Sequence, residues 1–196
     1  MGRSSAEQAA RNRRRIVAQA SRLFRERGVE NVSINDVMAA AGLTVGGFYK
    51  HFASKDALVQ EACALSFEQA LQSWLAVGGQ EEGGDARALE TLVRHYFRAR
   101  SADRRCPILA YAPDMPSPGT SSATRQTYDR GIEALFGVFA GDAGAGGSED
   151  GPQGTVDEAA VLFAAMVGAQ FLREATRGSA WSLSLLDAVT ERAQRA

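Results

Sequence analysis

The spacing of apolar residues along the chain is helical from end to end. Near the N-terminus Ile16, Ala20, Leu23 and Phe24 recur at intervals of three and four residues, which places them on one face of a helix. Further helices are predicted over 55–76, from residue 85, over 120–140, over 155–177 and from residue 184. No stretch shows the alternating pattern of a strand. The pattern therefore predicts an all-α fold.

Serine, threonine and glycine residues mark the predicted helix ends. The expected N-terminal capping residues, whose side-chain oxygens would accept hydrogen bonds from the first helical amides, are Ser5, Ser33, Thr44, Ser54 and Thr155, with Ser184 opening the last helix. Gly28 is expected to end the first helix. Two glycine-rich stretches, 78–84 and 141–154, are predicted to be loops. Pro107 should begin a short helical or irregular piece.

The stretch 33–58 predicts two short helices with a sharp turn between them. They meet at Gly42, where glycine permits a left-handed backbone. The residues spaced to fill the seam between the helices are Val37, Leu43, Phe48 and Phe52. This is the pattern of a helix-turn-helix, whose second helix lies in the major groove of DNA. A helical hairpin without any DNA-binding role is the structural alternative.

A net charge close to zero conceals two oppositely charged parts. The chain carries 22 Lys and Arg and 23 Asp and Glu, for a formal charge of −1. Residues 1–56 hold ten basic and five acidic side chains, so they carry +5, whereas the remainder carries −6. A basic head on an acidic body indicates that the head meets a polyanion. A solvated helix face would explain the same charges.

The composition of the chain argues against several classes of protein. A chain of 196 residues with 45% apolar residues can bury a core without disulfide staples, and two cysteines are too few for a disulfide scaffold. No leader or membrane-span pattern is apparent, so a cytoplasmic protein without a membrane partner is expected. Metal-ligand clusters, phosphate-binding loops and dinucleotide fingerprints are not recognised either, so no metal or cofactor is expected.

The segment A-G-L-T-V-G-G-F-Y-K-H-F-A-S-K-D-A-L at 41–58, preceded by R-R-I-V-A-Q-A-S-R-L-F-R-E-R-G at 14–28, resembles the DNA-binding domain of the TetR (TetR/AcrR) family of bacterial regulators. The resemblance implies a helix-turn-helix domain at 1–56. A connecting helix at 54–76 would lead into a helical ligand-binding and dimerisation domain at 57–196. It further implies a homodimer that binds a double-stranded DNA operator, more often as a repressor than as an activator, and responds to a small-molecule effector.

Matching positions assign the expected DNA contacts. Phosphate contacts are expected from Ser33, Thr44, Tyr49, His51 and Lys55. Gly46 and Gly47 would let the backbone approach DNA closely. Val45 and Lys50 are the expected readers of base edges, because valine can touch a thymine methyl and lysine can donate to guanine. The arginines expected to reach the backbone or the minor groove are Arg3, Arg11, Arg13 and Arg14. Structural alternatives are a core histidine at 51 and a seam-filling tyrosine at 49.

Two residues depart from the family's pattern. Met38 stands where many relatives carry alanine, so the packing between the two short helices is expected to widen or their angle to change. Val45 replaces the lysine common in relatives. That replacement removes a positive charge from the helix face that is expected to contact base edges. The operator sequence therefore cannot be inferred by analogy with relatives.

The C-terminal part resembles the family less. The candidates for binding a small apolar or aromatic ligand are Tyr96, Cys106, Tyr111, Tyr128 and Gln170, with plain core packing as the alternative. Small residues in the last two helices allow close helix packing, and the resemblance implies a four-helix bundle between two copies. The expected dimer-interface residues are Ala160, Phe163, Val167 and Phe171.

Other functions stay open at this point. Cys106 follows two arginines and precedes a predicted helix start, which are features that lower a thiol pKa, so a regulator that senses oxidants or electrophiles is one alternative. A small buried thiol is the structural alternative. An enzyme would need Cys106 with His95, the sole candidate pair. A non-specific architectural DNA-binding protein is a third possibility, which the acidic body disfavours.

Overall fold

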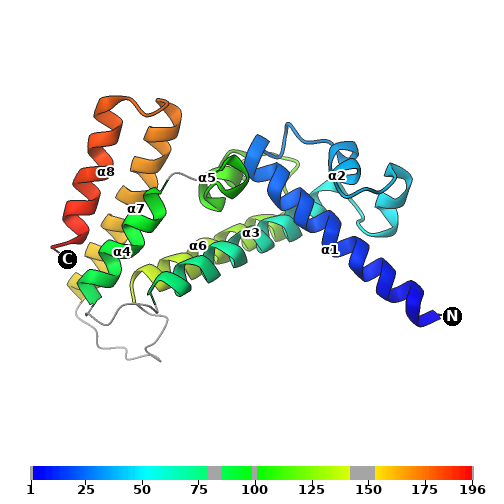
Figure 1. Ribbon diagram of the computed structural model, residues 1–196, viewed down its shortest axis with the longest axis horizontal. Coiled ribbons are helices and arrows are strands. Elements are labelled where there is room, and N and C mark those ends of the chain that lie inside the picture. The colour runs from blue at the N-terminus through cyan, green and yellow to red at the C-terminus, as the bar shows by residue number, and fades with distance from the viewer. Residues whose placement is uncertain (1, 79–84, 99–100, 142–152, 196) are drawn as a thin grey trace. The chain divides into compact units, whose positions relative to one another are not determined.

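The computed structural model describes residues 2–78, 85–98, 101–141 and 153–195 (Figure 1). The elements in these ranges are α1 (Gly2–Arg27), α2 (Ile34–Ala40), the 3-10 helix η1 (Val45–Lys50), α3 (Lys55–Gly78), α4 (Asp85–Phe97), η2 (Ala102–Arg104), α5 (Pro107–Tyr111), η3 (Ala112–Asp114), α6 (Ser122–Phe139), α7 (Gln153–Ala175) and α8 (Ala180–Ala193). No strand occurs in the described ranges. The predicted all-α class is confirmed.

The chain folds into two compact units. The first comprises the described residues within 1–69 and 100–131, and the second those within 70–99 and 132–196. Helices α3 and α6 each contribute to both units. These units group residues by packing, whereas the predicted boundary after residue 56 separates functions. That functional boundary stays a prediction.

The core of the first unit is built on the predicted apolar stripe of α1. Ile16, Ala20, Leu23 and Phe24 are all buried, which confirms the stripe. Tyr111 of α5 closes this core, with its ring edge-on to Phe24 at 6.5 Å between centroids. Burial of these apolar side chains is the main force that holds α5 against α1.

Helices α3 and α6 approach each other closely in the first unit. A Cβ atom added at Gly131 would lie 2.3 Å from Cγ of Phe67, so the phenyl ring occupies the space that any side chain at 131 would need. Gln60 of α3 also donates to the hydroxyl of Thr127 at 3.3 Å. The glycine is therefore required by the packing of this helix pair.

The core of the second unit is an aromatic cluster. Phe163 of α7 lies at its centre, with edge-on contacts to Trp74 at 6.4 Å and to Phe136 and Phe139 at 5.4 Å each. Tyr96 of α4 contacts Trp74 at 5.9 Å. Phe163, expected from the sequence at the dimer interface, is half-buried and packs its ring in this core, so its part in an interface stays a prediction.

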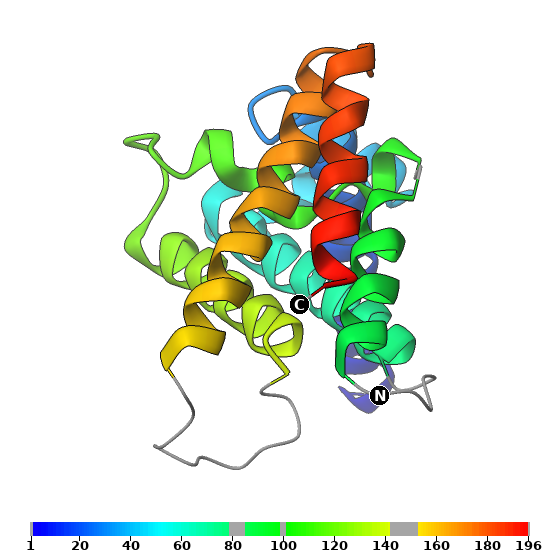
Figure 2. The ribbon, with the colours of Figure 1, turned by 90° about the vertical axis from the view of Figure 1, so that its left-hand side faces the viewer.

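Helices α4, α7 and α8 form the rest of the second unit (Figure 2). α8 packs beside both α7 and α4. The Arg173 guanidinium donates to the carbonyl oxygen of Phe97 at 2.8 Å, and Gln194 donates to the Glu90 carboxylate at 2.7 Å. These bonds fix the ends of α7 and α8 on α4.

Several predicted helix starts are wrong. α1 begins at Gly2, before the predicted cap Ser5, and α7 begins at Gln153, before Thr155. α8 begins at Ala180 with Ser179 at its N-cap position, four residues before Ser184. Hydrogen bonds at Ser182 accompany this earlier start. The Ser182 hydroxyl donates to the Ser179 carbonyl and accepts from the Thr176 hydroxyl, and these bonds hold the first turn of α8. Most of the two predicted glycine-rich loops lies outside the described residues.

Candidate nucleic-acid interface

The turn that leads into α2 is held by a capping box. The Ser33 hydroxyl accepts from the Asp36 amide at 3.1 Å, and the Asp36 carboxylate accepts from the Ser33 amide at 2.8 Å. Hydrogen bonds from the Ser33 side chain, and then from its backbone, hold the pKa of Asp36 below its ordinary value. The Ser33 hydroxyl also donates to Asp36 at 2.5 Å, so it is engaged in the cap rather than directed at a phosphate.

Helices α2 and η1 meet at the predicted glycine turn. Gly42 has a φ of 65°, the left-handed conformation that glycine adopts without strain. Val37, Met38, Phe48 and Phe52 are all buried in the seam, which Leu43 borders. The predicted helix-turn-helix seam is therefore present in the structure.

The second helix is tighter and shorter than predicted. η1 is a 3-10 helix that ends at Lys50, not an α-helix that reaches Phe52. Thr44 occupies its N-cap position, but its side chain makes no capping hydrogen bond, so the predicted side-chain cap is wrong. A 3-10 helix completes a turn in three residues, so successive side chains of this short element lie on clearly different faces. The Thr44 hydroxyl is left exposed at the start of η1.

The outer face of η1 exposes side chains that a folded chain ordinarily buries. Tyr49 is 72% exposed and Val45 is 44% exposed, whereas Phe48 between them is fully buried. The Tyr49 ring touches only the edge of Phe48, at 5.2 Å between centroids, among the ring contacts of the described residues. Lys50 is exposed and forms no ion pair with any residue that the structure describes. Tyr49 is thus not a seam-filling residue.

Gly46 and Gly47 are not required by the fold. A Cβ atom at Gly46 would meet nothing within 4 Å, and one at Gly47 would lie 3.8 Å from Cε of Met38, an ordinary contact. Neither glycine has a positive φ. Packing and backbone conformation within the chain therefore do not explain why these two positions lack side chains. Only a contact with another molecule could explain it. Met38 is fully buried beneath Gly47, which shows how the seam accommodates the methionine.

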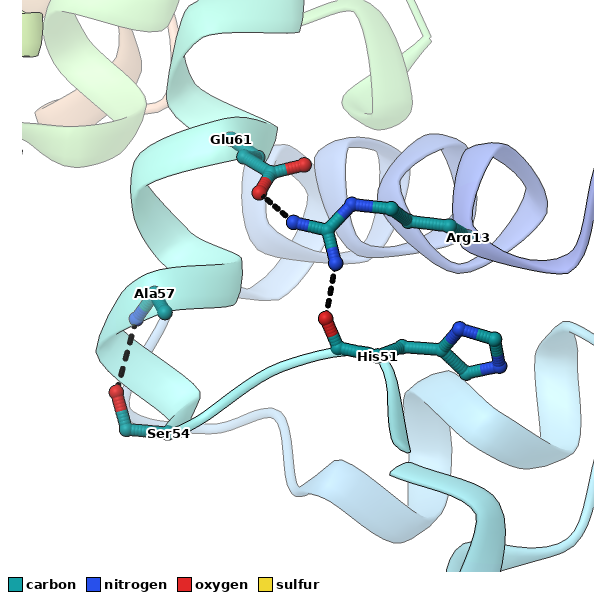
Figure 3. A network of polar contacts seen from close by, with 5 residues as sticks. All are labelled: Arg13, His51, Ser54, Ala57 and Glu61. Carbon is teal, nitrogen blue, oxygen red and sulfur yellow. Dashed lines mark hydrogen bonds and ion pairs between the residues drawn. The ribbon is translucent and has the colours of Figure 1, made fainter. Parts of the chain in front are cut away.

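His51 follows η1 and takes part through its backbone. Its amide donates to the Phe48 carbonyl at 2.8 Å. Its carbonyl accepts from Arg13, while its half-buried imidazole is directed away from that contact (Figure 3). The ring forms no hydrogen bond with a residue that the structure describes, which separates it from a satisfied core histidine.

Lys55 has a structural contact that the sequence did not predict. Its Nζ donates to the carbonyl oxygen of Val29 at 2.7 Å. The side chain therefore secures the connection between α1 and α2. The phosphate contact expected from Lys55 stays a prediction, since its half-buried ammonium group is hydrogen bonded to the chain itself in this structure.

Asp114 and Asp56 are polar residues in this unit that sequence reasoning missed. Burial raises the pKa of Asp114, while backbone amides of Val29 and Glu30 hydrogen bond to its carboxylate. The Asp56 carboxylate accepts from the Ser121 amide at 3.3 Å and from the Thr124 hydroxyl at 3.0 Å. Both acids fix chain segments that are distant in sequence. No local pattern marks either of them as structural.

The predicted DNA-reaching arginines of α1 differ in what they contact. Arg11 hydrogen bonds to Gln8 at 2.8 Å. Arg13 is bound to His51 and Glu61 (Figure 3) and also lies over the Phe52 ring. Arg14 is exposed and has no hydrogen-bond or ion-pair partner within the described residues. The side chain of Arg3 lies outside the description. Of the three whose side chains are described, Arg14 is the one without a hydrogen-bond or ion-pair partner in the described ranges.

The five candidate ligand residues do not all belong to one unit. Tyr111, Tyr128 and Cys106 lie in the first, and Tyr96 and Gln170 lie in the second. The Tyr111 hydroxyl is hydrogen bonded with Ser66 at 3.1 Å, and burial raises its pKa. The Tyr128 hydroxyl donates to the Ile108 carbonyl at 2.9 Å, and burial raises its pKa to about 12. Both phenols therefore serve the core of the first unit.

Gln170 is the candidate with an unused polar atom. It is 8% exposed, and its Nε2 donates to Glu174 at 2.8 Å. Its Oε1 is buried and has no hydrogen-bond partner in the described part of the chain. A buried acceptor without a partner is unfavourable by about 1–3 kcal/mol, so this atom is the best-placed group in the second unit to accept a hydrogen bond from a ligand.

The two thiols occupy different surroundings. Cys63 is fully buried, and burial raises its pKa to about 12, so it is an inert core thiol. Cys106 is half-buried at the N-cap position of α5 and makes no capping hydrogen bond with its side chain. His95, its predicted catalytic partner, is in the second unit and is hydrogen bonded with Ser73 at 2.9 Å.

Helices α7 and α8 present an apolar groove on the second unit. Its volume is about 500 Å³, and its apolar lining comprises Val161, Leu162, Ala165, Leu185, Ala188 and Val189. An ion pair between Glu158 and Arg192 also lines it. Of the predicted interface residues, Ala160 and Phe171 are exposed and Val167 is half-buried. The sequence missed Val161, Trp181 and Leu183, which are 71%, 54% and 45% exposed.

Membrane spans and metal clusters are both missing from the described ranges. No helix there combines the length and apolar composition that a membrane span requires. No group of three or more His, Cys, Asp and Glu side chains there could hold a metal ion.

Known proteins resemble the N-terminal region in sequence. A sequence profile described as "Bacterial regulatory proteins, tetR family" matches residues 16–62. The HTH-type transcriptional regulator AcrR of Shigella flexneri is 28% identical over 109 residues, which are 56% of this chain and 51% of that protein. The A-factor receptor protein of Streptomyces griseus is 34% identical over 99 residues, which are 46% of this chain and 33% of that protein. The matched segments span about half or less of these relatives.

Solved structures resemble nearly the whole chain. A TetR transcriptional regulator from Chloroflexus aurantiacus is 26% identical with a TM-score of 0.70, and the match covers 95% of this chain and 94% of that one. E. coli NemR in its reduced form has a TM-score of 0.72 at 17% identity and shows the shared fold alone, over 91% of this chain and 94% of that one. With the helix-turn-helix seam in place, residues 16–62 match the DNA-binding region of the TetR family of bacterial regulatory proteins, and the chain shares its fold with TetR-family structures.

Proposed function

We propose that the chain is a ligand-responsive transcriptional regulator that binds an operator through the outer face of η1 and acts as a repressor. The observation that carries the proposal is this face itself. It exposes Val45 and Tyr49 above a fully buried seam, and it carries a glycine that nothing inside the chain requires. Side chains exposed on a helix-turn-helix at the recognition position are the ones that meet DNA.

The proposed contacts follow from which groups are still available. Thr44, Tyr49 and His51 would bind phosphates, since their polar groups are not used in the seam. Val45 would touch a thymine methyl and Lys50 would donate to a guanine. The bare backbone at Gly46 and Gly47 would let η1 enter the groove deeply.

The proposed regulator is a homodimer formed through the α7–α8 groove. The groove is lined mainly by apolar side chains, among them the 71% exposed Val161, and Phe171 and Trp181 add further exposed apolar area on the same two helices. A second copy of this chain fits it best, because a two-fold axis pairs the same patch with itself. Two heads related in this way would sit about 34 Å apart, one turn of DNA.

The proposed effector is a small apolar or aromatic molecule bound in the second unit. The aromatic cluster around Phe163 supplies apolar walls, and Gln170 Oε1 supplies an acceptor for one hydrogen bond. The effector would favour a dimer whose heads no longer match two successive major grooves. Release from the operator requires only that the effector binds that state more tightly. The thiol-sensing alternative rests on Cys106, which is half-buried at the N-cap position of α5.

The test is selection of duplexes from a random pool by the purified protein. The selected duplex and a scrambled duplex are then compared by fluorescence anisotropy over a salt series. The proposal predicts a two-fold-symmetric site that is bound at least about a thousandfold more tightly than the scramble. Equal binding of both duplexes, governed by salt alone, would instead indicate an architectural protein.

A further inference from the structure

Three successive arginines of α1, Arg13, Arg14 and Arg15, have different surroundings. The Arg13 guanidinium reaches across to three partners that lie beyond η1. Two of them, the His51 carbonyl and the Glu61 carboxylate, are drawn in Figure 3, and the third is the Phe52 ring. Arg14 has no such partner among the described residues. Successive residues of a helix point about 100° apart, so only one of the three can face this junction.

We propose that Arg13 is a positioning residue that fixes the C-terminal end of η1 against α1 and α3. Through that contact it sets the orientation of the DNA-reading face, without touching DNA itself. The inference rests on the proposed function, because orientation matters only if η1 binds DNA. It replaces the direct phosphate or minor-groove contact that the sequence suggested for Arg13.

The His51 carbonyl is the group that makes the contact specific. His51 is the C-cap residue of η1, and carbonyls at helix ends lack partners within the helix. An N–H of Arg13 satisfies this one, and hydrogen bonds from a charged donor are stronger than neutral ones. The end of η1 is therefore tied to a residue of α1 that is 38 positions away in sequence.

Phe52 and Glu61 hold the guanidinium in place. Its central carbon lies 4.2 Å from the centroid of the Phe52 ring, and that ring is buried at 3% exposure. The planar guanidinium can stack on an aromatic face and still donate from its edge. Glu61, near the start of α3, forms an ion pair with the second terminal nitrogen of the Arg13 guanidinium. Its side chain and that of Arg13 are 40% and 41% exposed, so the ion pair orients more than it stabilises.

A substitution at Glu61 distinguishes a positioning role of Arg13 from simple electrostatic attraction of the DNA. Replacing Glu61 by glutamine removes a negative charge that contacts the DNA-binding head through Arg13, so charge attraction alone predicts tighter DNA binding. The positioning role predicts weaker binding, because the guanidinium loses the partner that orients it. The two explanations differ in the sign of the effect.

The experiment measures binding of the selected duplex by Arg13→Gln, Glu61→Gln and the double variant over a salt series. Arg14→Gln is the matched control, with the same residue type, charge change and helix. Arg13→Gln is expected to weaken binding about tenfold with an unchanged salt slope, and Glu61→Gln about threefold. The double variant regains the wild-type net charge but should bind no better than Arg13→Gln. Arg14→Gln should instead lower the slope by roughly 0.9 for each phosphate that the protein no longer neutralises.

Tighter binding by Glu61→Gln, or wild-type affinity in the double variant, would overturn the proposal. A reduced salt slope for Arg13→Gln equal to that of Arg14→Gln would also overturn it. Because Glu61→Gln leaves Arg13 and the buried seam intact, it stays informative if Arg13→Gln folds poorly.

A second readout needs no DNA. The His51 and Phe52 amides donate to the Phe48 carbonyl at 2.8 and 3.1 Å, and both should exchange with solvent faster in Arg13→Gln and unchanged in Arg14→Gln. Unchanged exchange in Arg13→Gln would contradict the positioning role. If the random pool yields no preferred duplex, the proposed function fails, whereas this arm still tests the contact.

Discussion

The outer face of η1 and the α7–α8 groove both expose large apolar side chains, yet they differ in what surrounds those side chains. Around Tyr49 and Val45 the neighbours along η1 are the exposed Lys50 and the bare backbone of Gly46 and Gly47. Around Val161 the neighbours are alanine, leucine and valine, and the nearby Arg192 is already paired with Glu158. Exposure alone therefore does not identify a partner.

The difference shows how electrostatic context selects the partner. A polyanion needs unpaired cations and backbone that it can approach, which the η1 face offers. A second protein surface needs apolar area whose charges are already compensated, which the groove offers. The following predictions test this assignment in order of decreasing effect.

The largest effect is expected from Val161→Glu. The glutamate would place an unpaired charge in the α7–α8 contact, so we expect the dimer dissociation constant to rise at least about a hundredfold. Sedimentation velocity measures the change. Leu75→Glu, which adds the same charge at a 46% exposed leucine of α3, is the control. A fully dimeric Val161→Glu protein would remove the groove from the dimer interface.

The next largest effect is expected at Gly131, a glycine that the fold requires. Its substitution gives a reference for the effect of substituting the glycines of η1. Gly131→Ala places a Cβ 2.3 Å from the Phe67 ring, so it should lower the free energy of unfolding by about 3 kcal/mol. Gly137→Ala in the same helix meets nothing within 4 Å and should raise it by about 0.5–1 kcal/mol. Denaturant unfolding measures both variants. Equal effects of the two would refute the close packing of α3 on α6.

Gly46→Ala should behave in the opposite way to Gly131→Ala. A Cβ at Gly46 has free space, so stability should change by less than about 0.5 kcal/mol. The added methyl group would stand between the η1 backbone and DNA, and we expect operator affinity to fall about tenfold. Anisotropy and thermal unfolding separate the two readouts. A stable variant with full affinity would show that the bare backbone has no role in binding.

The smallest effect concerns the capping box of α2. Ser33→Ala should destabilise the protein by about 1 kcal/mol, because an amide of the first turn loses its acceptor. The pKa of Asp36 is lowered from 3.8 in the folded state, so its contribution is present above that value and is lost as the pH falls through the folded pKa. Unfolding measured between pH 6 and about 2 should show this loss in the wild type, and Asp36→Asn should abolish it. A wild-type stability that is flat in acid would contradict the capping role.

Features set by local sequence could be predicted, and contacts between distant segments could not. The α1 stripe, the Ser33 capping box and the Gly42 turn all depend on residues within a few positions of one another. Arg13, by contrast, is bound to a glutamate 48 residues away, and Lys55 to a carbonyl 26 residues away. Periodicity gives the face of a helix but not what lies opposite it.

The aromatic residues show the same limit. The sequence suggests Tyr111 as a ligand residue and Phe163 as an interface residue, because nothing in it distinguishes an aromatic ring in a core from one in a pocket or on a surface. Val161 was not predicted, although it is the most exposed large apolar side chain among residues 158–175 of α7. Its neighbours are small, so the local pattern resembled ordinary close packing.

The most direct test of the assignment is a hydrogen-exchange footprint of the selected duplex on the dimer. The account predicts slower exchange for the amides of Thr44–Lys50 when the duplex binds, with no change along the α7–α8 groove. It also predicts that a scrambled duplex at the same salt concentration leaves the Thr44–Lys50 amides unchanged. Protection of the groove by DNA, or no protection of η1, would contradict the central claim that the two exposed surfaces serve different partners.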